Sequence, residues 1–597
     1  MSALFQRAIR ARKVRRTPVS AGRLATQRAS LNALRARGHI LRWKVALVLI
    51  WSVTAAWIIG GGLIRWAAWI IREQPDWMFH PLAPVLALSF GLSIWGIRWG
   101  PWSPDEVSPW MVVEGLDRLF SSGWYNAYPP VQFYLWAVSL TPVVIADRLG
   151  LISLGTDGAA TAMYALMRGV TVLMGIGVLV ATYLSAAAAF DRGSGILASL
   201  IVAVTLPFVY YAKTANMDVP YLFWMTCSLL LFIRLWDSDR TIDYVLFGVT
   251  AALAVCTKDH AYGFYTLLPV ALIGRRAARH PAGSRFQRLL RSALDRRLLI
   301  GGAASAVVFA CAQNILFNWD GVVGHFRLIT ALVAPGAPTL QRPLQFDFDL
   351  LATSVELVRW SFRWPLFILC VAGLVSALLS RQTRGITLWM LLPSVSYYLT
   401  YLRYMGYVYD RFLLGVCIPL AIVGGRLAAM ILTPRWRVAV PGRIGLAGAF
   451  GYALLAAVSM DVMMTVDARY AAEMWLRAHV GHDARVGWFG PGMYIPRLDY
   501  LDSTRLPLPP EGELVDGPPY LVVNTEVLAR SEPTGSLLLS KLQDHRLGYS
   551  EVWRGRSPLP WWAVLRYDPV FTNGRDDGTT NLDNVNPEIL ILKRDAE

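Results

Sequence analysis

Charged residues are scarce in this 597-residue chain: only 16% of its residues are Asp, Glu, Lys or Arg, whereas 55% are hydrophobic. The mean hydropathy is +0.42. A soluble protein of this length could not bury so much apolar surface. The composition therefore excludes an ordinary soluble protein and predicts a polytopic membrane protein.

Cysteine is also scarce, and none of the five cysteines lies in the polar C-terminal part of the chain. This distribution provides no disulfide framework and no CxxC metal motif, and it favours small, buried apolar side chains. Sequence repeats are missing as well, which excludes a solenoid. The basic N-terminus is too long for a signal peptide, and no small-residue cleavage site follows a short apolar core.

Acidic residues are absent from the first 45 residues, which carry twelve Lys and Arg. A second basic segment, 275–297, holds eight Arg and one acid. The net charge of +17 therefore falls in blocks between apolar runs, a pattern of membrane topology and not of nucleic-acid binding. The positive-inside rule places these blocks in the cytoplasm and the loop 99–160 outside.

The apolar runs are long enough for eleven membrane crossings. We expect them at residues 82–98, 161–190, 194–212, 218–236, 241–257, 260–275, 298–317, 361–380, 385–402, 411–432 and 443–464. Segment 129–148 would invert the charge pattern if it crossed, so we expect it to lie in the outer interface. Segment 45–71 raises the same difficulty, and both a crossing and a bend at Gly60-Gly61-Gly62 stay open.

The chain becomes polar after Asp461. Residues 467–480 predict an amphipathic helix with Ala471, Met474, Trp475 and Ala478 on one face. Strands are expected at 485–489, 520–524 and 589–592, and a helix at 536–547. The expected parts are a basic tail (1–44), an apolar segment of open topology (45–80), an all-α membrane domain (81–464) with outer loops 99–160 and 318–360, and an extracytoplasmic α/β domain (465–597).

Two adjacent carboxylates, Asp105 and Glu106, stand at the mouth of the first predicted span. Carboxylates in such a place are costly unless they meet water, a cation or a substrate. They are candidates for a catalytic base, and the alternative is that they cap a short helix at 106–120. Tyr128 opens the Tyr128-Pro129-Pro130 element in the same aromatic loop.

Several polar residues fall at outer ends of the later spans. Lys213, Lys258 and Arg411 could each hold a phosphate, since Arg offers a forked donor and Lys a point charge; the alternative for each is snorkelling to the interface. Asp218 begins a helix, where capping and substrate contact are both reasonable. His260 and, less strongly, His325 could line the same cavity.

The stretch SPDEVSPWMVVEGLDRLFSSGWYNAYPPVQFYLWA (103–137) resembles the first outer loop of C-type membrane glycosyltransferases, in particular the protein O-mannosyltransferase and aminoarabinose transferase group. Further matches follow in order at YYAKTANMDVPYLFW (210–224), CTKDHAYGFYTLLP (256–269) and DRFLLGVCIP (410–419). Asp259 and His260 stand where that group usually has Gly.

The resemblance implies an integral-membrane inverting glycosyltransferase that uses a polyprenyl-phosphate sugar donor and acts on a protein, lipid or glycan acceptor. In that interpretation Asp105 or Glu106 acts as the base, Arg411 and Lys258 receive the phosphate, and His260, Asp218 and Tyr128 line the site. It also implies a bacterial-type cytoplasmic membrane with the site and C-terminal domain outside.

No cofactor is predicted. Two DxD patterns, Asp237-Ser-Asp239 and Asp347-Phe-Asp349, could suggest a divalent metal, but a donor with one phosphate has less need of one than a nucleotide diphosphate. Two other classes stay open: a transporter or lipid flippase, which would show repeats and mid-membrane charges, and a non-catalytic assembly component.

Overall fold

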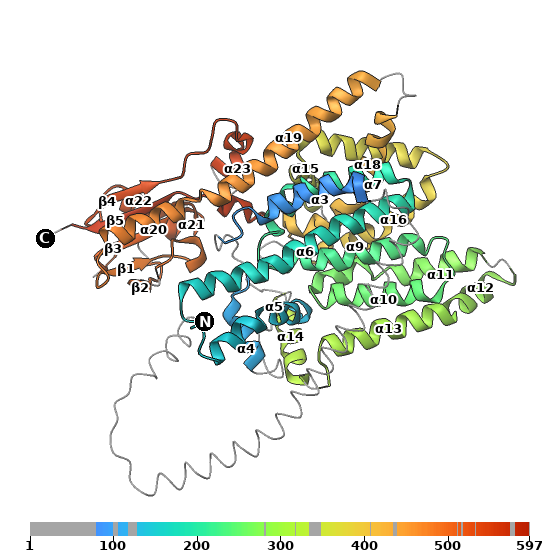
Figure 1. Ribbon diagram of the computed structural model, residues 1–597, viewed down its shortest axis with the longest axis horizontal. Helices are drawn as coiled ribbons and strands as arrows, with labels where there is room; N and C mark the ends of the chain where they lie inside the picture. The colour runs from blue at the N-terminus through green and yellow to red at the C-terminus, as the bar shows by residue number, and fades with distance from the viewer. Residues whose placement is uncertain are drawn as a thin grey trace, which may run out of the picture. The chain divides into compact units, whose positions relative to one another are not determined.

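The computed structural model describes residues 79–98, 106–117, 128–279, 282–316, 318–332, 348–405, 407–433, 439–498, 500–509, 512–514, 517–531, 533–572 and 579–595 (Figure 1). The chain divides into two units, Met1–Met78 and Phe79–Glu597. All described residues belong to the second unit. The predicted basic tail and nearly all of segment 45–80 lie outside the described residues.

The predicted fold class is confirmed: a helical domain of apolar helices precedes a small domain with a β-sheet. The long helices follow the predicted spans and are α3 (Phe79–Ile94), α6 (Asp157–Ala189), α9 (Asp218–Arg234), α10 (Thr241–Val255), α13 (Arg296–Ala312), α15 (Phe348–Leu379), α16 (Arg384–Tyr397), α18 (Leu414–Leu432) and α19 (Ala439–Thr465). Figure 1 shows α6, α9, α10 and α13 packed in sequence beside one another.

Among the described residues, four helical segments are long and apolar enough to cross a membrane, and three shorter helices are similarly apolar. The four are Gly158–Ala189, Phe348–Leu379, Asp410–Leu432 and Val440–His479. The count of eleven crossings stays a prediction.

Two predicted spans are interrupted. The expected run 194–212 forms α7 (Arg192–Ala203) and α8 (Leu206–Tyr211), with Pro207 in the first turn of α8. In an unbroken helix Pro207 would lack the N–H that bonds to the Ala203 carbonyl and its ring would clash with that carbonyl, which is consistent with the end of α7 at Ala203. The run 260–275 begins as the 3-10 helix η2 (Asp259–Phe264) and continues as α11 (Leu268–Arg279).

Short helices connect the long ones. They are α4 (Pro109–Asp117), α5 (Val131–Arg148), α12 (Arg285–Ala293), α14 (Trp319–Leu332), the π-helical turn Tyr398–Leu402, α17 (Arg403–Met405) and the 3-10 turn η4 (Asp410–Leu413). Helix α5 corresponds to the predicted non-crossing segment 129–148. Its buried face packs against α4, α6 and the loop before α9 through Phe133, Trp136 and Ala215.

The C-terminal domain holds a five-stranded sheet in the order β2-β1-β3-β5-β4. The strands are β1 (Arg485–Trp488), β2 (Asp502–Arg505), β3 (Tyr520–Asn524), β4 (Tyr549–Gly555) and β5 (Ile589–Arg594). Strand β1 is parallel to β2 and β3, whereas β5 is antiparallel to β3 and β4. Helix α20 (Ala468–His479) covers one face, while α21 (Thr525–Ala529) and α22 (Thr534–Gln543) cover the other; α23 (Pro569–Thr572) follows β4.

The buried face of α20 differs from the apolar face predicted for helix 467–480. Met474 is 66% exposed, and Ala478 is exposed too. The buried face instead carries Ala468, Ala472 and Leu476, together with two charged residues, Arg469 and Glu473. Both buried charges have partners: Arg469 pairs with Asp467, and Glu473 pairs with two arginines. Charged side chains can be buried when they are paired in this way.

Candidate active site

Glu106 is held in place near the start of the loop 99–160. Its carboxylate accepts two hydrogen bonds from Arg168 of α6, at 2.6 and 3.0 Å, and one from the backbone N–H of Ala215, at 2.8 Å. Both charged side chains are only 1% exposed. This forked, charge-assisted arrangement anchors the segment that follows Asp105. Asp105 itself lies outside the described residues.

Asp218 and Lys258 form a second buried pair. The Lys258 Nζ donates to Asp218 Oδ1 at 2.6 Å, and the two side chains are 9% and 2% exposed. Asp218 is the first residue of α9, and Lys258 immediately precedes η2, so helix ends set both positions. The negative charge of the Asp218 carboxylate balances the positive charge of the buried Lys258 ammonium.

Lys258, His260 and Arg411 meet around the Phe412 ring. The Lys258 Nζ and the Arg411 Cζ each lie 5.7 Å from its centroid, a cation–π distance. The His260 ring lies 5.3 Å from it and receives or donates a hydrogen bond at Nδ1 with the Tyr397 hydroxyl, at 3.2 Å. Three of the residues proposed from sequence for one ligand therefore surround one aromatic ring.

Two backbone hydrogen bonds attach the described part of loop 99–160 to this cluster. The Val107 N–H donates to the Ala215 carbonyl at 2.8 Å, three residues before Asp218. The Val131 N–H donates to the Cys256 carbonyl at 3.0 Å, two residues before Lys258. Tyr128 packs against the apolar cluster that includes Val107 and Ala215. Glu106, Tyr128, Asp218, Lys258, His260 and Arg411 thus belong to one connected region.

The partners of these residues were not predicted from the sequence. Arg168 is the counter-ion of Glu106, and a lone arginine inside a long apolar helix is a signal that a partner exists. Asp410 accepts a hydrogen bond from Thr580 of the C-terminal domain at 2.7 Å. Nothing local in the sequence around Thr580 indicates that contact, because the two residues are 170 positions apart.

Two other candidates have defined partners. Lys213 pairs with Asp461 at 2.6 Å and donates to the Trp95 carbonyl at 2.8 Å; both members of the ion pair are fully buried. This arrangement joins α19 to the end of α3 and favours a structural role. His325 of α14 contacts Asp259 at 2.9 Å, next to His260.

The two DxD patterns do not form a metal centre among the residues the structure describes. Asp239 contacts Arg276 and Arg297, at 3.1 and 3.3 Å, in the basic loop. Asp347 lies outside the described residues. No group of three potential metal ligands occurs in the described part of the chain.

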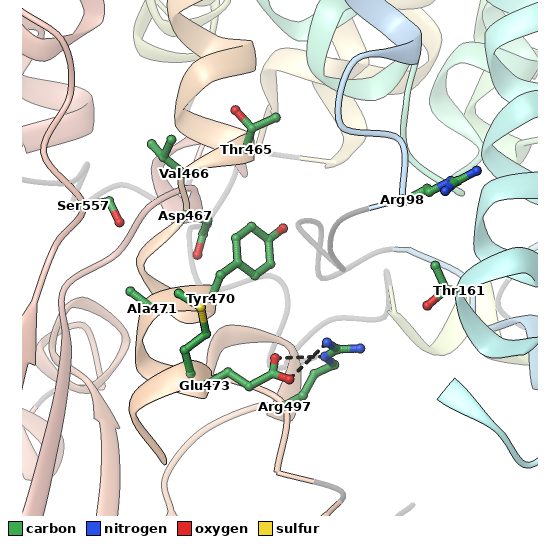
Figure 2. A pocket seen from close by; sticks show the side chains of 11 residues that line it. Arg98, Thr161, Thr465, Val466, Asp467, Tyr470, Ala471, Glu473, Arg497 and Ser557 are labelled. Carbon is green, nitrogen blue, oxygen red and sulfur yellow. Dashed lines mark hydrogen bonds and ion pairs between the residues drawn. The ribbon is translucent and has the colours of Figure 1, made fainter. Parts of the chain in front are cut away.

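A cavity of about 580 Å³ opens between the helical and C-terminal domains (Figure 2). One wall carries Arg98 and Thr161, and the opposite wall carries Tyr470, Glu473 and Arg497. In Figure 2 the Tyr470 ring projects from α20 toward the Arg98 side. The Arg497 guanidinium donates two hydrogen bonds to the Glu473 carboxylate, each of 3.0 Å. The size suits a small ligand or the end of a larger one.

This cavity lies beside the Glu106 anchor. Arg168, which binds Glu106, also donates to the Ile97 carbonyl at 2.8 Å, and Ile97 precedes Arg98 of the cavity wall. The segment containing Asp105 runs in the chain between these two anchored points.

Residues 136–289, about a quarter of the chain, match the family model described as dolichyl-phosphate-mannose-protein mannosyltransferase. This segment of the chain is similar to that family. The resemblance predicted from the outer-loop and helix-end motifs is confirmed, and the matched segment contains Arg168, Asp218, Lys258 and His260.

Some solved structures are similar to this chain at low sequence identity. The oligosaccharyltransferase of Archaeoglobus fulgidus in complex with Zn and sulfate has a TM-score of 0.46 at 11% identity, covering 85% of this chain and 88% of that one. ArnT from Cupriavidus metallidurans bound to undecaprenyl phosphate has a TM-score of 0.42 at 13% identity, covering 86% and 98%. A comparison with curated protein sequences finds no match.

Proposed function

We propose that this protein is an inverting glycosyltransferase that moves a sugar from a polyprenyl-phosphate carrier to an acceptor at the outer face of the membrane. The main support for this proposal is that Lys258 and Arg411 both lie close to the Phe412 ring. In addition, residues 136–289 match a family whose name specifies dolichyl-phosphate-mannose, a lipid-phosphate sugar, as the donor. The sugar and the acceptor class stay open.

The two cations suit the charge that develops during transfer. The acceptor oxygen attacks the anomeric carbon while the bond from that carbon to the phosphate oxygen breaks. The phosphodiester, with one negative charge, becomes a phosphomonoester with up to two. Lys258 and Arg411 therefore interact more strongly with the leaving group than with the donor, and such a difference lowers the barrier.

Asp105 is the proposed base that takes the acceptor proton. Glu106 has a different role in this proposal, because Arg168 and the Ala215 N–H occupy both of its oxygens. A carboxylate engaged in this way positions its neighbour in the chain and is poorly placed to accept a proton. Asp218 keeps Lys258 charged and oriented before the donor arrives.

The acceptor is proposed to approach through the cavity lined by Arg98 and Tyr470. That cavity adjoins one end of the segment that contains Asp105, while the Lys258 cluster is linked to the other end through Ala215. The basic blocks predicted to be cytoplasmic support an outward orientation of this region.

The experiment uses the full-length protein in lipid bilayers with polyprenyl-phosphate sugars labelled in the sugar, and membrane extracts as acceptors. We expect label transfer with one donor, and loss of transfer in Asp105→Asn by about 10²–10⁴-fold with unchanged donor binding. Full activity of Asp105→Asn would contradict the assignment of the base. Movement of intact carrier lipid across the bilayer without transfer would favour the flippase alternative.

A further inference from the structure

A buried polar run in the C-terminal domain reaches the Arg411 segment. Residues 580–586 read Thr-Asn-Leu-Asp-Asn-Val-Asn, and none of them is more than 7% exposed. Polar residues are seldom buried in succession unless they hold other groups in place. Their hydrogen bonds reach the start of α20, Ser557, Arg530 and the 3-10 turn η4 that precedes α18.

The first of these attachments is made by Asn586. Its side-chain oxygen accepts from the Ala468 and Ser557 N–H groups, at 3.0 and 3.2 Å, and its own N–H donates to Asp467 at 2.7 Å. Its side-chain amide donates to the Ser557 carbonyl at 3.0 Å. The run is therefore fixed to the body of the C-terminal domain.

The second attachment is made by Thr580 and Thr579 to Asp410. The Thr580 hydroxyl donates to Asp410 Oδ2 at 2.7 Å, and the Asp410 N–H donates to the Thr579 carbonyl at 3.0 Å. The other carboxylate oxygen, Oδ1, accepts from the Arg411 backbone N–H at 2.6 Å. Asp410 is fully buried, so these bonds fix the orientation of its carboxylate.

The orientation of the Asp410 carboxylate affects Arg411, because Arg411 is the next residue in the chain. With the carboxylate tied to Thr580 and the backbone, the guanidinium lies 4.7 Å from the Tyr409 ring and 5.7 Å from Phe412, where Lys258 also lies. A carboxylate released from Thr580 would be free to rotate and pair with the guanidinium, in competition with a phosphate.

We propose that Thr580 is a positioning residue for the donor phosphate: it holds Asp410 away from the Arg411 guanidinium and so makes the phosphate site depend on the C-terminal domain. The role of Arg411 in this statement rests on the proposed function. The dependence on Thr580 rests on the hydrogen bonds themselves.

The test compares Thr580→Val, which keeps the shape and removes the hydroxyl, with Thr580→Ser, which restores it. Thr525→Val is the matched control, because Thr525 is also a buried threonine of the C-terminal domain, with its hydroxyl bonded to Glu588 instead of Asp410. The full-length protein is titrated with undecaprenyl phosphate, and its intrinsic tryptophan fluorescence reports binding. In parallel, mass spectrometry measures the rate at which phenylglyoxal modifies Arg411.

We expect Thr580→Val to weaken binding by about tenfold and to slow modification of Arg411, as loss of a hydrogen bond to a charged group would do. Thr580→Ser and Thr525→Val should both resemble the wild type. Unchanged Arg411 reactivity in Thr580→Val, or an equal loss in Thr525→Val, would overturn the positioning role. A wild type that does not bind undecaprenyl phosphate, with Arg411 reactivity still dependent on Thr580, would contradict the donor class alone.

Discussion

The ion pair between Arg168 and Glu106 allows a quantitative test of how the segment that begins at Glu106 is held. Arg168→Met leaves a carboxylate that is 1% exposed with the Ala215 N–H as its remaining contact in the described structure. Breaking a buried pair in this way costs about 3–5 kcal/mol of unfolding free energy. Glu106→Gln keeps an uncharged acceptor and leaves Arg168 bonded to the Ile97 carbonyl, so its cost is smaller, about 1–3 kcal/mol.

The double variant Glu106→Gln, Arg168→Met has no buried charge left at this position. Its loss of stability should therefore be smaller than the sum of the two single losses, by about 0.5–3 kcal/mol. The assay is denaturant unfolding of the purified full-length protein in lipid nanodiscs, with sugar transfer measured in parallel. Both single variants should also transfer more slowly, because Asp105 is peptide-bonded to the anchored residue. Strictly additive losses would refute the idea that the two side chains act as one buried pair.

Three further predictions concern other parts of the molecule. Asp218→Asn removes the carboxylate that keeps Lys258 charged and oriented, so undecaprenyl phosphate should raise the melting temperature of this variant less than that of the wild type; an equal rise would contradict this role of Asp218. Gly425→Leu should destabilise the protein by about 1–3 kcal/mol in thermal unfolding, because a Cβ at Gly425 meets the backbone of α7, and wild-type stability would contradict this close packing. Burial alone would raise the pKa of Glu588, but the hydrogen bond and charge of Arg554 hold that pKa below its ordinary value of 4.5. The pair therefore stabilises the C-terminal domain above that pH and ceases to do so as pH falls through the lowered pKa, and Glu588→Gln should weaken this acid dependence in pH-resolved unfolding.

The helical domain was largely predictable because long apolar runs have few alternatives in a membrane. The breaks in those runs were less visible. The expected span at 194–212 contains Pro207, a signal for a helix start that the apolar composition obscured. Arg363 in α15 has a backbone φ of 60°, and its side chain pairs with Asp568 of the C-terminal domain at 2.6 Å. No local pattern predicts a partner so far along the chain.

The sheet, like the helical domain, was only partly predictable from the sequence. Strands β1, β3 and β5 were predicted because their apolar side chains enter the core, whereas β2 and β4 were missed. These two strands form the edges of the sheet, and most of their residues are exposed. Edge strands commonly carry polar residues that prevent further pairing, so their apolar signal is weak. The inner face of α20 was misjudged for a related reason, since its buried Glu473 is neutralised by Arg477 and Arg497.

For the candidate site, charge at the ends of apolar segments was the useful signal. It singled out Glu106, Asp218, Lys258 and Arg411, which the structure connects. The roles assigned to them stay predictions. What could not be read from sequence is the set of partners contributed by distant segments, such as Thr580, because hydrogen bonds between helices and a separate domain leave no periodic pattern.

The central claim is that Lys258 and Arg411 hold one lipid phosphate together. Its most direct test is the dissociation constant of undecaprenyl phosphate for Lys258→Met, Arg411→Met and the double variant, with Arg384→Met as a control arginine near the start of α16. We expect the affinity to fall by about 10–100-fold in each single variant, the value for one charge-assisted contact, and to stay unchanged in the control. Wild-type affinity in either single variant, or an equal loss in the control, would contradict it.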